Sequence, residues 1–100
     1  LNFRSKYRAA DIEKKNNSVV PGALFEISKS DEKKLDVYED FPILYKKYYF
    51  FYYGKKVMTY IMNKKTAFRY PTERYLNIIK RGYKDCKLDT KYLKRALISN

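Results

Sequence analysis

The 100 residues carry a formal net charge of +12, and 45% of them are hydrophobic, which is enough apolar material for one small folded domain. A single cysteine, Cys86, and the absence of histidine exclude an internal disulfide, a zinc site of the Cys/His type and a catalytic histidine base. No segment approaches the roughly 20 apolar residues of a membrane span, and no signal peptide is visible. We therefore expect a cytoplasmic protein that does not enter a membrane.

In the first quarter of the chain, the sequence predicts a polar segment over residues 1–17 and a strand over residues 19–27. Residues 1–17 are polar, although Leu1 and Phe3 alternate as they would in a strand, and Asn16-Asn17-Ser18 is a turn signal. "VVPGALFEI", residues 19–27, has the apolar character of a buried strand. Its Pro21-Gly22 pair indicates a bulge or a close backbone approach.

A short helix is predicted from Ser28 or Ser30 to about Glu39. Either serine can cap its N-terminus, and Asp31 and Glu32 fall in the first turn, where the helix dipole favours acids. Pro42 ends the helix.

The rest of the chain predicts a hairpin and two helices. "ILYKKYYFFYY" and "KVMTYIMN" form the hairpin of residues 43–63, with Gly54-Lys55 at its turn. One helix starts at Pro71 or Thr72 and ends at Gly82, and the last begins at Asp89. This order of elements predicts an α+β protein with a mostly antiparallel or mixed sheet.

The acidic residues are unevenly placed for so basic a chain. Five of the eleven acids lie in residues 31–40, directly before the most aromatic segment of the sequence. The set "VVPGALFEIS…KKLDVYED…LYKKYYFF…VMTYIM…PTERYLNIIKRGYKDCKLDTKYL" resembles the gamma-glutamylcyclotransferase-like family, in order and spacing, over nearly all of residues 19–97. The resemblance implies a small β-barrel-like sheet with flanking short helices.

The resemblance also implies an activity and a catalytic residue. Family members release an amine or amino acid from a gamma-glutamyl compound and form 5-oxoproline, and the Glu of their L-D-x-x-E motif is the acid/base. That residue is Glu39 here. A partly apolar site that raises its pKa would suit both proton transfers. On the residues alone, a solvated acid at a helix end is the favoured interpretation of Glu39, and the resemblance is what favours the catalytic role. Asp36 is expected to be structural, bonding backbone groups.

Three tyrosines and one glycine complete the implied site. Tyr45, Tyr60 and Tyr75 stand where family members place tyrosines around the substrate pocket, although each also suits an aromatic core position. Gly22 matches a glycine that lets the sheet pack closely. No metal or cofactor is implied, and the partner is a small gamma-glutamyl substrate.

The chain departs from the family at two points. Asp40 stands where the family usually has Gly, and the Y-G-S loop that binds the substrate's carboxylate is absent from the sequence. We therefore interpret residues 1–100 as one domain that lacks its N-terminal strand and substrate loop, and we expect these residues alone to be inactive. The open sheet edge is expected to permit a homo-oligomer.

A second interpretation is a basic, non-enzymatic domain that binds nucleic acid or another protein. The strand "YKKYYFFYY" combines lysines with aromatic side chains on which bases can stack. Both of its faces are aromatic, as in a buried strand, and the basic residues are spread along the chain. Binding of nucleic acid is therefore the less favoured interpretation.

Overall fold

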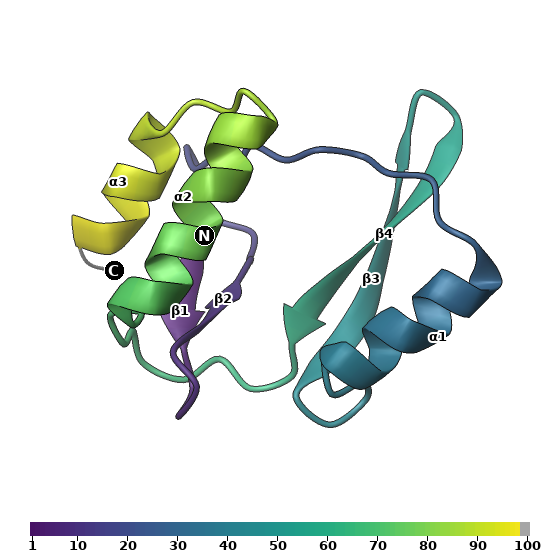
Figure 1. The fold of residues 1–100 in the computed structure, drawn as a ribbon, viewed down its shortest axis with the longest axis horizontal. Coiled ribbons are helices and arrows are strands. Elements are labelled where there is room, and N and C mark those ends of the chain that lie inside the picture. The colour runs from purple at the N-terminus through teal and green to yellow at the C-terminus, as the bar shows by residue number, and fades with distance from the viewer. Residues whose placement is uncertain (99–100) are drawn as a thin grey trace. The chain divides into compact units, whose positions relative to one another are not determined.

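The computed structural model describes residues 1–98, which form two compact units (Figure 1). One unit combines residues 1–24 with the segment from residue 66 onward, and the other consists of residues 25–65. The described residues confirm an α+β protein with antiparallel strands. They contain two separate two-stranded sheets and no closed barrel, so the expected barrel-like sheet is not observed.

The first unit consists of a small hairpin and two helices. Its strands β1 (Asn2–Arg4) and β2 (Ala9–Asp11) pair antiparallel, with Phe3 opposite Ala10. Helices α2 (Glu73–Asp85) and α3 (Lys91–Ile98) follow in the C-terminal third of the chain. Thr72 caps α2 by accepting the backbone N–H of Tyr75. The predicted helices are confirmed, except that α2 continues past Gly82.

Aromatic and aliphatic side chains from these elements form the hydrophobic core of the first unit. Phe3 is fully buried, and it packs with residues of α2 and α3, which are Leu76, Tyr83, Leu93 and Ala96. Arg4 is also buried. Its Nε lies 3.2 Å from Asp11 Oδ2, an ion-pair contact without hydrogen-bond geometry, and its Nη2 donates to Glu13 at 2.8 Å.

The second unit consists of α1 (Lys29–Tyr38) and the hairpin of β3 (Tyr45–Tyr52) and β4 (Lys55–Met62). Of the two serines that the sequence offers as caps, Ser28 is the one that caps α1, and it forms a capping box with Asp31. The hairpin turns at Tyr53-Gly54, one residue earlier than predicted, because Tyr52 pairs with Lys55.

The prediction of a strand over residues 19–27 is wrong. The structure has no strand there. The large apolar side chains of this segment are exposed: Val19, Val20, Leu24, Phe25 and Ile27. A Cβ added at Gly22 would meet no atom within 4 Å, so the close packing expected at this glycine is absent. An apolar run can form a strand only where a neighbouring strand supplies hydrogen-bond partners for its backbone, and residues 19–27 have no such neighbour within the described residues.

Leu93 tests the core of the first unit. Its side chain is 2% exposed, so Leu93→Ala should destabilise this unit by about 2–5 kcal/mol through lost burial and a cavity. Ile98→Ala on the same helix, at a side chain that is 79% exposed, should change stability by about 0.5 kcal/mol or less. Denaturant unfolding measures both. Equal costs for the two variants would contradict this core assignment.

Tyr53 tests the turn of the second unit. Tyr53 and Gly54 have φ of 48° and 75°, and this left-handed pair is the conformation that Asn-Gly adopts readily. Tyr53→Asn should therefore stabilise the hairpin by about 1 kcal/mol in thermal or denaturant unfolding. Tyr52→Asn, at a position inside β3, should give no such gain, and a gain there would argue against backbone strain as the cause.

Candidate functional site

The helix α1 turns its acids toward the hairpin. No residue of α1 is fully buried. Its partly buried residues are Glu32, Leu35 and Asp36, and its C-cap Glu39 is partly buried as well. Spacings of three and four residues place side chains on one face of a helix. Two acids of this face, Glu32 and Asp36, bond to side chains of the hairpin. The acids of residues 31–40 therefore include two that bind the basic hairpin.

Asp36 and Lys47 are the centre of these contacts. Lys47 Nζ lies 3.0 Å from Asp36 Oδ2 and 2.6 Å from Glu32 Oε2. Tyr60 Oη donates to Asp36 Oδ1 at 2.5 Å. Because Lys47 and Tyr60 are directly opposite in the β3–β4 register, Asp36 ties α1 to both strands at once. Lys47 also lies over the ring of Phe41, 4.6 Å from its centroid.

These contacts shift the ionisation of their members. The hydrogen bond from Tyr60, supported by Lys47, lowers the pKa of Asp36 below its ordinary 3.8 despite the opposing effect of burial. Hydrogen bonds to Glu32 and Asp36 raise the pKa of Lys47. Burial, followed by the hydrogen bond to Asp36, raises the pKa of Tyr60. Asp36 is therefore a structural acid, but its partners are side chains and not the backbone groups that we expected.

Glu39 differs from these acids because its carboxylate has no partner among the described residues. It is the C-cap of α1, and its backbone N–H donates to Leu35 O at 2.8 Å. The side chain is half-buried, and burial raises the pKa of Glu39 above its ordinary 4.5. A partly desolvated carboxylate without an ion pair can accept and return a proton, which is the property required of an acid/base.

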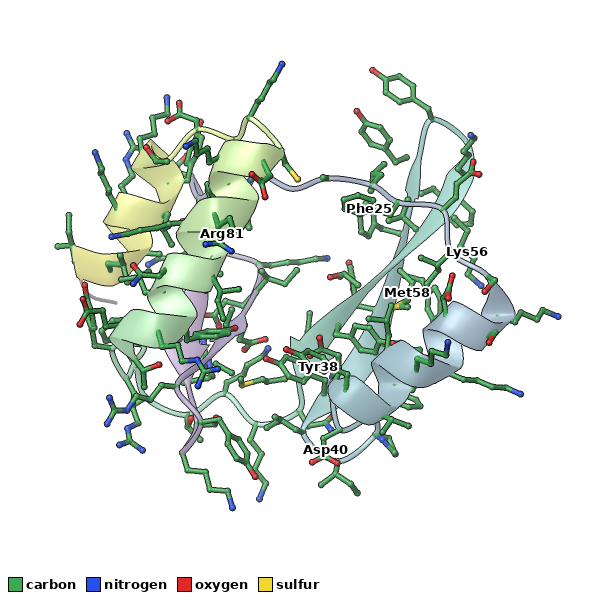
Figure 2. All side chains as sticks on the ribbon, viewed as in Figure 1. Phe25, Tyr38, Asp40, Lys56, Met58 and Arg81 are labelled. Carbon is green, nitrogen blue, oxygen red and sulfur yellow. The ribbon has the colours of Figure 1, made fainter. Side chains whose placement is uncertain are left out.

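The residue after Glu39 has the backbone of a glycine. Asp40, seen directly after α1 in Figure 2, has a φ of 52° in the left-handed region, which Gly adopts freely and Asp tolerates. The substitution of Asp for the Gly of the resembling family is therefore compatible with the local turn. The chain leaves the helix here, and Leu44 N–H donates back to Asp40 O at 2.8 Å.

Two of the three predicted tyrosines belong to the same unit as Glu39. Tyr45 is buried on β3, and its ring meets that of Tyr60 edge to face at a centroid distance of 6.5 Å. The Tyr60 hydroxyl is committed to Asp36. Tyr75 lies on α2 in the first unit, where its hydroxyl accepts the backbone N–H of Ala10 at 3.1 Å. The role of all three in substrate binding stays a prediction.

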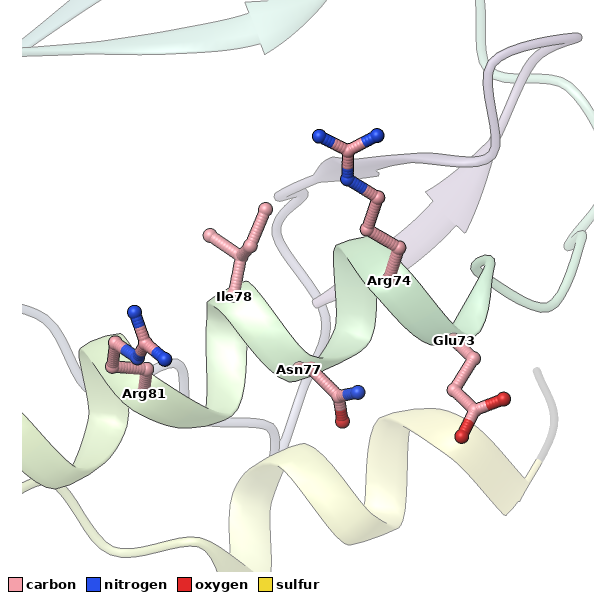
Figure 3. A pocket seen from close by; sticks show the side chains of 5 residues that line it. All are labelled: Glu73, Arg74, Asn77, Ile78 and Arg81. Carbon is pink, nitrogen blue, oxygen red and sulfur yellow. The ribbon is translucent and has the colours of Figure 1, made fainter.

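A hollow on α2 provides no further candidate for a functional site. It measures about 470 Å³, and its walls come from a single helix, by way of Glu73, Arg74, Asn77, Ile78 and Arg81 (Figure 3). Ligand sites generally enclose their ligand between several elements, whereas this hollow lies open along one helix surface. A smaller hollow, between residues 15–19 and α3, also excludes Glu39.

Lys47 and Glu32 were not identified from the sequence as members of this cluster. A usable signal exists, because Glu32 and Asp36 are four residues apart on a predicted helix and Lys47 interrupts an aromatic strand. Within residues 1–98, no group of three or more metal-binding side chains is present, and none of the described helices is long and apolar enough to cross a membrane.

Comparisons of the chain with protein-family models, with curated proteins and with solved structures find no match. The residues and their geometry are therefore the basis of any functional conclusion.

Acid should weaken the attachment of α1. Since the folded pKa of Asp36 is lowered, its stabilising contribution is complete well above pH 3.8 and is lost as the pH falls through the folded pKa. Thermal unfolding of the wild type and of Asp36→Asn, followed against pH, should show a difference at neutral pH that vanishes in acid. Asp40→Asn, an exposed control, should behave as the wild type. A difference that persists at low pH would show that the charge of Asp36 is not the cause.

Proposed function

We propose that the chain is a domain of a gamma-glutamylcyclotransferase-like protein, in which Glu39 is the catalytic acid/base. The observation that carries the proposal is the state of Glu39, a half-buried carboxylate with a raised pKa and no partner among the described residues. The left-handed backbone of Asp40 supports it, because the resembling family places a glycine there.

The proposed reaction needs one group that accepts protons from the attacking nitrogen and returns them to the leaving nitrogen. The α-amino nitrogen of the gamma-glutamyl substrate attacks its own γ-carbonyl carbon, and a C–N bond closes the five-membered ring of 5-oxoproline. The α-nitrogen is an ammonium in the substrate and keeps a single hydrogen in the ring, so it loses two protons. Glu39 takes the first before the attack and delivers it to the leaving nitrogen as the original amide bond breaks, and it then relays the second from the ring nitrogen to the released amine, which departs as an ammonium. No water, metal or redox partner is consumed. A raised pKa favours both transfers near neutral pH.

The other acids of α1 have a supporting role in this proposal. Asp36 stays ionised and bonded to Lys47 and Tyr60, so it holds the helix whose end carries Glu39. Environments that lower the pKa of one carboxylate and raise that of its neighbour separate a structural acid from a chemical one. Tyr45 lies beside Tyr60 and is proposed to contribute to the wall of the substrate site.

Replacement of Glu39 tests the proposal. In the protein at its natural length, Glu39→Gln should lower the rate of 5-oxoproline release from gamma-glutamyl amino acids and amines by roughly 10²–10⁴-fold, since it removes a general acid/base. Folding should be unaffected or slightly improved above pH 4.5, because a desolvated charge that disfavours the folded state is removed.

The matched control is Glu26→Gln, which makes the same change at an exposed residue of the second unit and should leave the rate unchanged. Absence of 5-oxoproline release from the wild-type protein, or an active Glu39→Gln variant, would contradict the proposed function. A loss of activity that is equal in both variants would point to a general loss of charge or stability.

The alternative function, a non-enzymatic binding domain, is favoured by one observation. The aromatic side chains near the hairpin turn are exposed instead of buried, with Tyr53 89% and Phe51 75% exposed. An exposed aromatic surface of this kind is typical of a binding site for a macromolecule.

A further inference from the structure

The outer edge of β3 has unused hydrogen-bonding groups. Tyr52 and Lys55 flank a two-residue turn, so backbone bonds between the strands alternate from that pair along the register. By this alternation, the N–H and C=O groups of Lys47, Tyr49 and Phe51 point away from β4. Within the described residues β3 pairs with β4 alone, so this edge can accept another strand.

The side chains of the same strand are also exposed. Tyr48, Tyr49, Phe50, Phe51, Tyr52 and Tyr53 are consecutive aromatic residues whose exposed fractions run from 38% to 89%. Together they expose the equivalent of about three whole aromatic side chains, roughly 500–700 Å². A stable interface buries about 800 Å² per partner. The exposed aromatic side chains of the hairpin therefore provide most of the surface area that each partner of a stable dimer buries.

A second copy of this strand is a suitable partner in charge as well as in shape. Residues 45–62 contain four lysines and no acid, so a parallel alignment of two copies would place lysine beside lysine. In an antiparallel alignment centred on Tyr49, Lys46 is opposite the other copy's Tyr52, while Lys47, whose ammonium is bonded to Glu32 and Asp36, is opposite the other copy's Phe51. The chain already makes such a contact, since Lys56 Nζ lies 4.4 Å from the ring centroid of Tyr49.

We propose that two copies of the chain associate through the β3 edge, in a two-fold antiparallel pairing that makes one four-stranded sheet. A two-stranded hairpin is only marginally stable in water, and sheets of three or more strands with an apolar face are stable, so the pairing stabilises each hairpin. The interface is isologous, because the same residues of both copies meet. This proposal is independent of the proposed enzyme activity.

The test is the mass of the protein in solution, measured by light scattering or sedimentation over a wide range of concentration. The wild type should have twice the monomer mass and dissociate on dilution. Tyr49→Lys or Phe51→Lys places a new charge at the paired edge and should raise the dimer dissociation constant about tenfold or more. Tyr7→Lys makes the same substitution at an exposed tyrosine of the first unit, outside the hairpin, and should leave the dissociation constant unchanged.

Amide hydrogen exchange provides a second measurement that needs no variant. The N–H groups of Lys47, Tyr49 and Phe51 should be protected in the dimer and exchange freely after dilution, whereas those of Tyr48 and Phe50 should stay protected by β4. A protein that remains a monomer at every concentration would overturn the proposal. A monomer that binds single-stranded oligonucleotides at low salt, with binding lost in Phe51→Ala, would overturn it in favour of a stacking surface for nucleic acid.

Discussion

The carboxylate of Asp36 is the group on which the second unit depends. The helix α1 has no fully buried residue, so hydrophobic burial contributes little to its position. Asp36 instead accepts hydrogen bonds from Lys47 on β3 and Tyr60 on β4, and Glu32 adds a second ion pair to Lys47. One basic side chain and one phenol of the hairpin therefore fix a helix that is too short to be stable in isolation.

The same arrangement places Glu39 in a different environment from its neighbours. One turn beyond Asp36, the chain leaves the helix through the left-handed residue Asp40, and Glu39 is half-buried with no ion pair to any residue from 1 to 98. Because the hairpin's Lys47 is already bonded to Glu32 and Asp36, it does not neutralise Glu39. A structural role for two acids thus leaves a third available for chemistry, and this division is the physical basis of the proposed function.

The sequence predicts local elements well and long-range partners poorly. A serine cap before α1, a start of α2 at Pro71 or Thr72 and the aromatic hairpin could be identified because each is specified by residues close together in the chain. The strand over residues 19–27 could not be excluded, because its formation depends on a partner strand that no local pattern reveals. For the same reason a local motif was enough to propose Glu39 as a candidate, and that role stays a prediction, whereas the bonds of Asp36 to Lys47 and Tyr60 required the structure.

Amide hydrogen exchange of α1 is the most direct measurement of this account. If Asp36 holds α1 on the hairpin, Asp36→Asn should release a helix that cannot persist alone, and the N–H of Glu39 should then exchange much faster than in the wild type. Protection within β3 and β4 should change little, because their ladder does not involve Asp36. Unchanged protection of α1 in Asp36→Asn would contradict the account, since the helix would then be held by something other than this carboxylate.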